Sequence, residues 1–193
     1  PLPNTADELR FIAASLKAPA NALNLGDQAT ERRVKQSDLA SARVIAFATH
    51  GLMAEEFHGL AEPALVLTPP AKASELDDGL LTASEISQLK LNADWVVLSA
   101  CNTAASDGKP GAEGLSGLAR AFFYAGARAL MVTHWAVETK SSAALTTGVF
   151  EKAAKGLSKA DALRQSMLAH MQRKDIPDAH HPAMWAPFIV VGD

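Results

Sequence analysis

Apolar residues in this chain follow two patterns that alternate along the sequence. Short runs that are apolar almost throughout predict buried strands at 43–49, 64–67, 94–100, 127–133 and 188–191. Between these runs, apolar residues recur at helical spacing, which predicts helices at 5–17, 114–124, 138–155 and 158–172. Apolar strands separated by helices are typical of a mostly parallel β-sheet with helices on both faces, so we expect an α/β fold.

Polar residues mark the beginnings of some helices. Thr5 with Glu8 and Thr82 with Glu85 each fit a capping box, in which a threonine hydroxyl and a glutamate carboxylate satisfy free backbone N–H groups. The stretch 29–36 reads as a short polar helix, and we expect its charged side chains to form a solvated face.

Composition narrows the class of protein. The 193 residues fit a single domain, and 48% hydrophobic content is enough for a sizeable core. The net charge is −3 and the basic residues are scattered, so neither direct nucleic-acid binding nor a polybasic membrane patch is indicated. No apolar run approaches the roughly 18 residues of a membrane span.

The single cysteine and the first residue add two expectations. One cysteine excludes an internal disulfide and fits a reducing compartment, so we expect a cytoplasmic location. The chain begins with proline instead of methionine, which indicates a piece of a longer protein or a processed form.

Candidate chemistry lies where two predicted strands end. His50 follows the strand at 43–49, and Cys101 follows the strand at 94–100. If these strands are parallel neighbours, both side chains emerge at the same carboxyl edge of the sheet, where open α/β sheets bind ligands. A thiol beside an imidazole supplies a nucleophile and its proton acceptor. Gly51, which has no Cβ, would let a substrate carbonyl approach backbone N–H groups closely.

Other interpretations of these residues stay open. Cys101 could instead be a buried small hydrophobe, the commonest fate of a free cysteine. His134 also ends a predicted strand and competes with His50 as the base. His180 and His181 are adjacent, and no further ligand has suitable spacing, so we expect no metal site. We expect no cofactor.

Several blocks in order give a more specific picture. The sequence resembles the CHAT domain, a caspase-like family related to separase and more distantly to gingipain and clostripain. The blocks are at 47–51, 78–86, 94–104, 111–122, 135–137, 181–185 and 188–193. The resemblance implies one domain over 1–193 with a caspase-like, mostly parallel sheet. It also implies that His50 moves protons while the Cys101 thiolate attacks the scissile carbonyl, with the N–H groups of Gly51 and Cys101 holding the oxyanion.

The sequence departs from the family in two places. Relatives carry aspartates after the segment matching Trp135, whereas this chain has Glu138 followed closely by Lys140. We therefore expect a substrate pocket formed by Trp135, His134 and Glu138, with at most a mild preference for basic residues. The family's first strand normally precedes the segment matching Leu2, so we expect a C-terminal part of a longer protein that lacks this strand.

Two functions from different classes remain. The first is a cysteine endopeptidase of the caspase and separase type, with a protein or peptide substrate. It would be gated by a partner protein or by an N-terminal region such as helical repeats. The second is a catalytically silent, caspase-like signalling or interaction module. Both dyad residues, His50 and Cys101, are present, which favours the peptidase.

Overall fold

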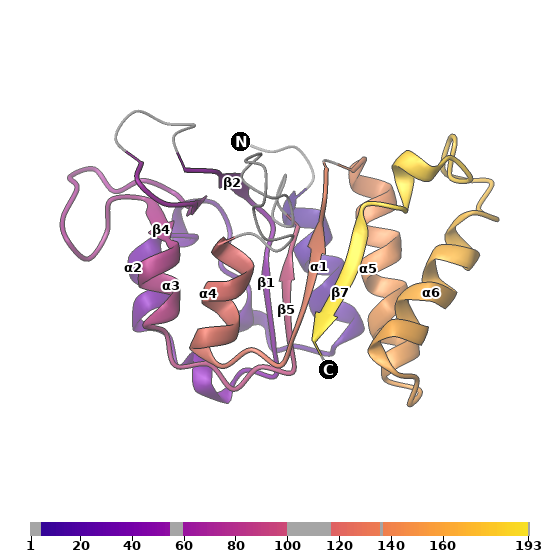
Figure 1. Ribbon diagram of the computed structural model, residues 1–193, viewed down its shortest axis with the longest axis horizontal. Helices are drawn as coiled ribbons and strands as arrows, with labels where there is room; N and C mark the ends of the chain where they lie inside the picture. The colour runs from indigo at the N-terminus through magenta and orange to yellow at the C-terminus, as the bar shows by residue number, and fades with distance from the viewer. Residues whose placement is uncertain (1–4, 55–59, 100–116, 136, 193) are drawn as a thin grey trace, which may run out of the picture.

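The computed structural model describes residues 5–54, 60–99, 117–135 and 137–192. Its main sheet has the strand order β1-β5-β6-β7 (Figure 1). The strands are β1 (Val44–Phe47), β5 (Trp95–Leu98), β6 (Ala129–Thr133) and β7 (Phe188–Gly192). Strands β1, β5 and β6 are parallel, and β7 pairs antiparallel with β6. The predicted α/β class with a mostly parallel sheet is confirmed.

Alternation along the strands sends side chains to two separate cores. In β1, Ile45 and Phe47 face the first core, and Val96 and Leu98 of β5 lie opposite them in register. Trp95 and Val97, at the positions between, face the second core, with Met131 of β6. Because both faces are apolar, helices have to cover both.

The first face is covered by α3 (Ala83–Ser87) and α4 (Gly117–Ala125), as Figure 1 shows. The Phe122 ring of α4 lies 5.6 Å from the Phe47 ring of β1, centroid to centroid. Helix α4 is followed directly by Gly126, which has a φ of +109°. A Cβ at this position would collide with the Leu91 carbonyl, so the close approach requires glycine.

The second face is covered by α1 (Thr5–Ser15), α5 (Thr139–Ala153) and α6 (Lys159–His170). Ile12 of α1 and Val149 of α5 are buried there with Trp95. The Trp95 ring meets the Phe150 ring edge-on at 5.6 Å. The helix expected at 5–17 is thus confirmed, ending two residues earlier than its apolar pattern suggested.

The chain also forms a small second sheet, which the sequence did not predict as a sheet. It consists of β2 (His50–Leu52), β3 (Ala64–Val66) and β4 (Leu80–Thr82), all antiparallel. The predicted strand at 43–49 is therefore wrong at its end, because β1 stops at Phe47 and His50 begins β2. The Thr49 hydroxyl donates to the Val66 carbonyl and fixes the redirected chain against β3.

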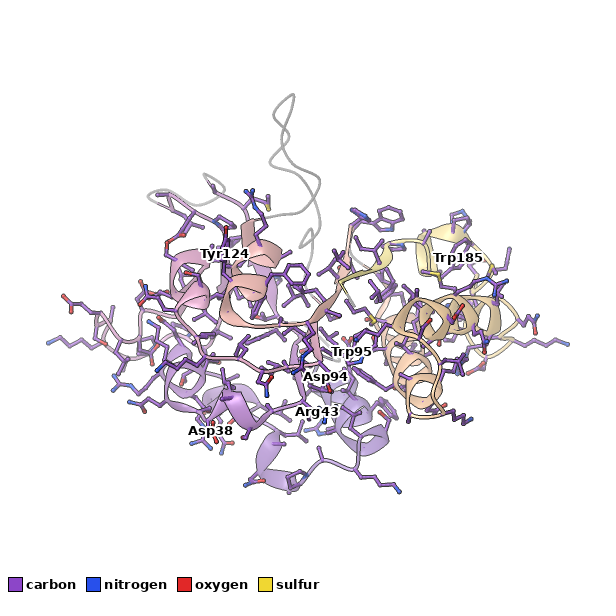
Figure 2. All side chains as sticks on the ribbon, turned by 60° about the horizontal axis from the view of Figure 1, so that its bottom comes forward. Asp38, Arg43, Asp94, Trp95, Tyr124 and Trp185 are labelled. Atoms are coloured by element: carbon purple, nitrogen blue, oxygen red, sulfur yellow. The ribbon has the colours of Figure 1, made fainter. Side chains whose placement is uncertain are left out.

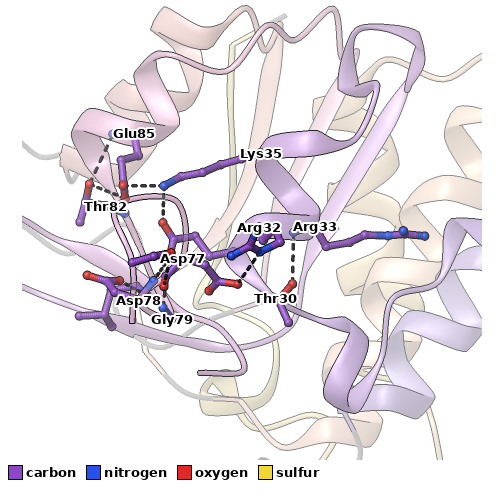
Figure 3. A network of polar contacts seen from close by, with 12 residues as sticks. Thr30, Arg32, Arg33, Lys35, Asp77, Asp78, Gly79, Thr82 and Glu85 are labelled. Atoms are coloured by element: carbon purple, nitrogen blue, oxygen red, sulfur yellow. Dashed lines mark hydrogen bonds and ion pairs between the residues drawn. The ribbon is translucent and has the colours of Figure 1, made fainter. Parts of the chain in front are cut away.

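Two glutamates are buried in the fold. Helix α2 (Glu31–Gln36) is not simply a solvated face, because Glu31 is 1% exposed. Its carboxylate accepts hydrogen bonds from the N–H groups of Asp78 and Gly79 and pairs with Lys35, so its charge is satisfied inside the fold (Figure 3). Glu8 of α1 is also buried, and its two carboxylate oxygens accept hydrogen bonds from serine hydroxyls inside the domain.

The connections contain short 3-10 helices. In the described residues these are η1 (Ala20–Ala22), η2 (Gly26–Gln28), η3 (Leu39–Ser41) and η4 (Pro182–Met184). None of the helices in this part of the chain is both long enough and apolar enough to cross a membrane.

Charged residues gather at the amino edge of the main sheet. Asp94, just before β5, pairs with Arg43 before β1 and with Arg128 before β6. Figure 2 shows Arg43 and Asp94 side by side at this edge. Burial alone would raise the pKa of Asp94, but hydrogen bonds from the two guanidinium groups hold it below its usual value. These ion pairs hold together the starts of three parallel strands.

Candidate active site

The candidate site lies at the opposite, carboxyl edge of the sheet. Strands β1 and β5 are parallel neighbours, and Phe47 at the end of β1 is the register partner of Leu98 at the end of β5. The pairing extends one residue further, because the Ser99 N–H donates to the Phe47 carbonyl at 2.9 Å. The expectation that the two strands preceding His50 and Cys101 are parallel neighbours is confirmed.

The structure describes His50 but not Cys101. His50 lies three positions beyond Phe47, and its exposed side chain begins β2. Cys101 lies three positions beyond Leu98 and falls outside the described residues. The equal offsets from a registered pair of strand ends are the geometric basis for considering the two together.

Gly51 is the residue expected to help hold an oxyanion. It occupies β2, where Leu65 of β3 is its register partner. Its backbone therefore belongs to a strand of the small second sheet. The position of its N–H relative to Cys101 stays a prediction, since Cys101 is outside the described residues.

His134 and Trp135 lie on the other side of β5. They follow β6, so β5 has on each side a parallel strand that leads to a histidine. The His134 N–H donates to the Pro187 carbonyl at 3.0 Å, and the Trp135 indole N–H donates to the Ala183 carbonyl at 3.3 Å. The Trp135 side chain is 43% exposed and is available to form a pocket wall. His50 and His134 both remain candidates for the base.

Glu138 has a structural role that the sequence analysis did not assign. Its carboxylate accepts a hydrogen bond from the Ser141 N–H at 2.9 Å and so caps the N-terminus of α5. Burial alone would raise the pKa of Glu138, but backbone hydrogen bonds from Lys140 and Ser141 hold it below its usual value. The residue is exposed and charged, so the same side chain can also face a substrate.

A buried polar cluster behind the carboxyl edge escaped the sequence analysis. The two carboxylate oxygens of Glu8 accept hydrogen bonds from the Ser142 hydroxyl at 2.9 Å and from the Ser99 hydroxyl at 3.0 Å. Burial raises the pKa of Glu8 despite the two hydroxyl donors. The available signal was spacing, since Glu8 and Ile12 are four positions apart and share the buried face of α1.

Metal ligands do not gather in the described part of the chain. There, no three His, Cys, Asp or Glu side chains lie together in a way that could hold a metal ion. His181 serves locally, with its Nδ1 accepting the Ala183 N–H at 3.2 Å to cap η4.

A mostly parallel sheet covered by helices on both faces defines an α/β domain, and this arrangement is compatible with a caspase-like fold. Comparison with known families matches the CHAT domain, which is a caspase-like family, over residues 1–193. The chain belongs to this family.

Two curated relatives match the whole chain. Tetratricopeptide repeat protein 28 from Mus musculus is 27% identical over 226 residues, covering 100% of this chain and 9% of the relative. The protein of the same name from Homo sapiens is 26% identical over 219 residues, covering 100% of this chain and 8% of the relative. The chain thus spans less than a tenth of the length of these relatives.

Proposed function

We propose that this domain is a cysteine endopeptidase of the caspase and separase type, with Cys101 as nucleophile and His50 as base. The observation that carries the proposal is the registered pairing of β1 with β5, whose ends lead to the two residues over equal distances in sequence. The exposure of His50 supports it, because a base that receives a proton beside a substrate must be accessible.

The chemistry assigns one role to each group. His50 accepts the proton of the Cys101 thiol, and the thiolate sulfur forms a bond to the scissile carbonyl carbon. The carbonyl oxygen takes the negative charge, which the N–H groups of Gly51 and Cys101 stabilise. The amide C–N bond then breaks, and the leaving amine takes the proton from the His50 imidazolium. Water hydrolyses the remaining thioester, which releases the acid and regenerates the thiol.

Substrate and control are part of the proposal. Trp135 and His134, which follow β6 beside β5, form the wall of the substrate pocket, with Glu138 at its rim. A peptide substrate with a basic residue before the cut is mildly preferred, because the pKa of Glu138 is held low and the carboxylate is charged.

The relatives are named for tetratricopeptide repeats, which supports restraint of the site by a preceding repeat region. We place the enzyme in a reducing compartment, the cytoplasm.

An irreversible thiol-directed peptide probe and a fluorogenic peptide library test this function. Cys101→Ala should abolish labelling and hydrolysis. His50→Ala should reduce hydrolysis by about a hundredfold or more, since a positioned base typically contributes that factor. The matched control is His180→Ala, which removes an exposed histidine from the loop before η4.

The outcomes separate the alternatives. A loss with His134→Ala, together with activity within about tenfold for His50→Ala, would reassign the base to the strand on the other side of β5. If neither probe labelling nor hydrolysis occurs, with or without the preceding chain, the domain is a catalytically silent interaction module.

A further inference from the structure

Ser99, two positions before Cys101, is fixed by three different elements. Its N–H donates to the Phe47 carbonyl of β1 at 2.9 Å. Its hydroxyl donates to Oε2 of Glu8 on α1 at 3.0 Å and lies 3.2 Å from the Ser142 hydroxyl of α5. The Ser142 hydroxyl in turn donates to Oε1 of Glu8 at 2.9 Å, so the three side chains form a closed triangle.

Filling the space behind the sheet with this triangle costs free energy. Glu8 is 2% exposed and Ser142 is 4% exposed, and a buried carboxylate carries a desolvation penalty that hydroxyl donors offset only in part. An apolar side chain of similar volume would fill the same space without that penalty. A carboxylate differs from an apolar side chain in that its two oxygens fix two donors at defined positions.

We infer that Glu8 is a positioning residue that holds the end of β5 in the geometry from which Cys101 acts. The inference rests on the proposed function and adds the device that orients the nucleophile. Glu8 belongs to α1, the first helix of the domain, which packs against α5. Any displacement of α1 from α5 breaks the triangle and releases the Ser99 hydroxyl from Glu8. The docking of this helix is therefore coupled to the reactivity of Cys101, and a region that precedes the domain can act through it.

The effect should appear in turnover and leave substrate binding unchanged. Glu8 and Ser142 are buried and do not touch substrate, so losing the triangle should lower kcat with little change in KM. A misplacement of about 1 Å in a reacting group can cost a hundredfold in rate, so a partial loosening should cost about tenfold.

Alkylation by iodoacetamide tests the inference without requiring peptidase activity. Cys101 is the only cysteine of the chain, so the rate of alkylation reports on this thiol alone. The rate is measured against pH in the whole protein for the wild type, Glu8→Gln and Ser142→Ala. Asp7→Asn is the matched control, because Asp7 is the adjacent residue on α1 and its side chain is 59% exposed.

We expect Glu8→Gln and Ser142→Ala to change the alkylation rate near neutral pH by about tenfold and to shift the midpoint of its pH profile. Asp7→Asn should leave both unchanged. Glu8→Gln keeps the shape of the side chain, and Ser99→Ala, which removes one hydroxyl, replaces it if the glutamine variant does not fold. Thermal unfolding identifies folded variants.

Two failures can be told apart. If folded Glu8→Gln and Ser142→Ala have alkylation rates within about twofold of the wild type at every pH, the positioning role is wrong. If the wild type does not hydrolyse peptides but the variants still change alkylation, the peptidase proposal fails and the positioning role stands.

Discussion

At the scale of single residues, the buried carboxylate of Glu31 connects several segments of the chain. It joins α2 to the chain before β4, accepting the Asp78 N–H at 2.7 Å and the Gly79 N–H at 3.0 Å. Lys35 contacts Glu31 and also Glu85, at 2.7 Å, so one ammonium forms ion pairs with two carboxylates (Figure 3). Segments far apart in sequence are thereby held together by one side chain.

Glu31→Ala should lower the free energy of unfolding by about 3 kcal/mol, because it leaves two backbone donors without their buried acceptor and leaves Lys35 with Glu85 as its one remaining ion-pair partner among the described residues. Urea unfolding at neutral pH measures the loss. Asp27→Asn, an exposed change just before α2, serves as the control and should stay within about 0.5 kcal/mol of the wild type. A loss below about 1 kcal/mol for Glu31→Ala would contradict the network's role.

Glu8 gives a prediction on the pH dependence of stability. Burial raises its pKa in the folded protein, so the unfolded chain releases its proton at lower pH than the folded one. The stability associated with Glu8 is fully present below its usual pKa of 4.5 and is lost as the pH rises through the raised value. Relative to Glu8→Gln, the wild type should therefore lose stability from pH 4 toward pH 8. Urea titrations across this range test it, and a constant difference would argue against a raised pKa.

At the scale of elements, the two glutamates that follow a threonine at Thr-x-x-Glu spacing make different contacts. In α3 the pair forms the expected capping box: the Thr82 N–H donates to Glu85 at 2.9 Å, and the Glu85 N–H donates back to the Thr82 hydroxyl at 3.4 Å. In α1 the glutamate of the pair, Glu8, turns inward to Ser99 and Ser142. Local spacing determines what a carboxylate can reach, and tertiary contacts decide where it goes.

Glu85→Gln should cost about 1 kcal/mol at neutral pH, since it weakens both the cap and the contact with Lys35. Burial alone would raise the pKa of Glu85, but hydrogen bonds from Lys35 and Thr82 hold it below 4.5. Its stabilisation is thus present above the usual pKa and is lost as the pH falls through the lowered one. Urea unfolding should show the two proteins converging at acid pH. Glu151→Gln, an exposed change on α5, should show no such convergence.

The difference between local sequence patterns and tertiary contacts also explains which elements the sequence could predict. β5 is apolar throughout, β6 is apolar except for Thr133, and both are found where expected, because burial on both faces selects a nearly continuous apolar run. β2 and β4 have three residues each, too few for a period to emerge, and the antiparallel direction of β7 leaves no mark in its composition. At the candidate site, the parallel pairing of β1 with β5 could be predicted from α/β topology. The triangle around Glu8 joins positions remote in sequence, which no local pattern contains.

At the scale of the whole molecule, one sheet separates two apolar cores. Ile86 of α3 is fully buried in the first core, and Val149 of α5 is fully buried in the second. Every residue of β5 is buried, alternating between the two cores, so neither core can open without exposing the shared strand. The faces should therefore unfold as one cooperative unit.

Paired truncations on opposite faces test this cooperativity. Ile86→Val should cost about 1 kcal/mol and Val149→Ala about 2 kcal/mol, small enough to leave the double variant folded. Because the two residues belong to different cores, the losses should add to within about 0.5 kcal/mol. Of the three tryptophans, Trp95 and Trp185 belong to the second core and Trp135 is already 43% exposed in the folded protein. The change in tryptophan fluorescence on unfolding therefore follows mainly the second face, while far-ultraviolet circular dichroism follows all helices. In the Ile86→Val protein the two signals should shift together during urea unfolding, because loss of the first core exposes β5 and with it Trp95. A fluorescence transition that stays at its wild-type midpoint would show that the second face unfolds independently of the first.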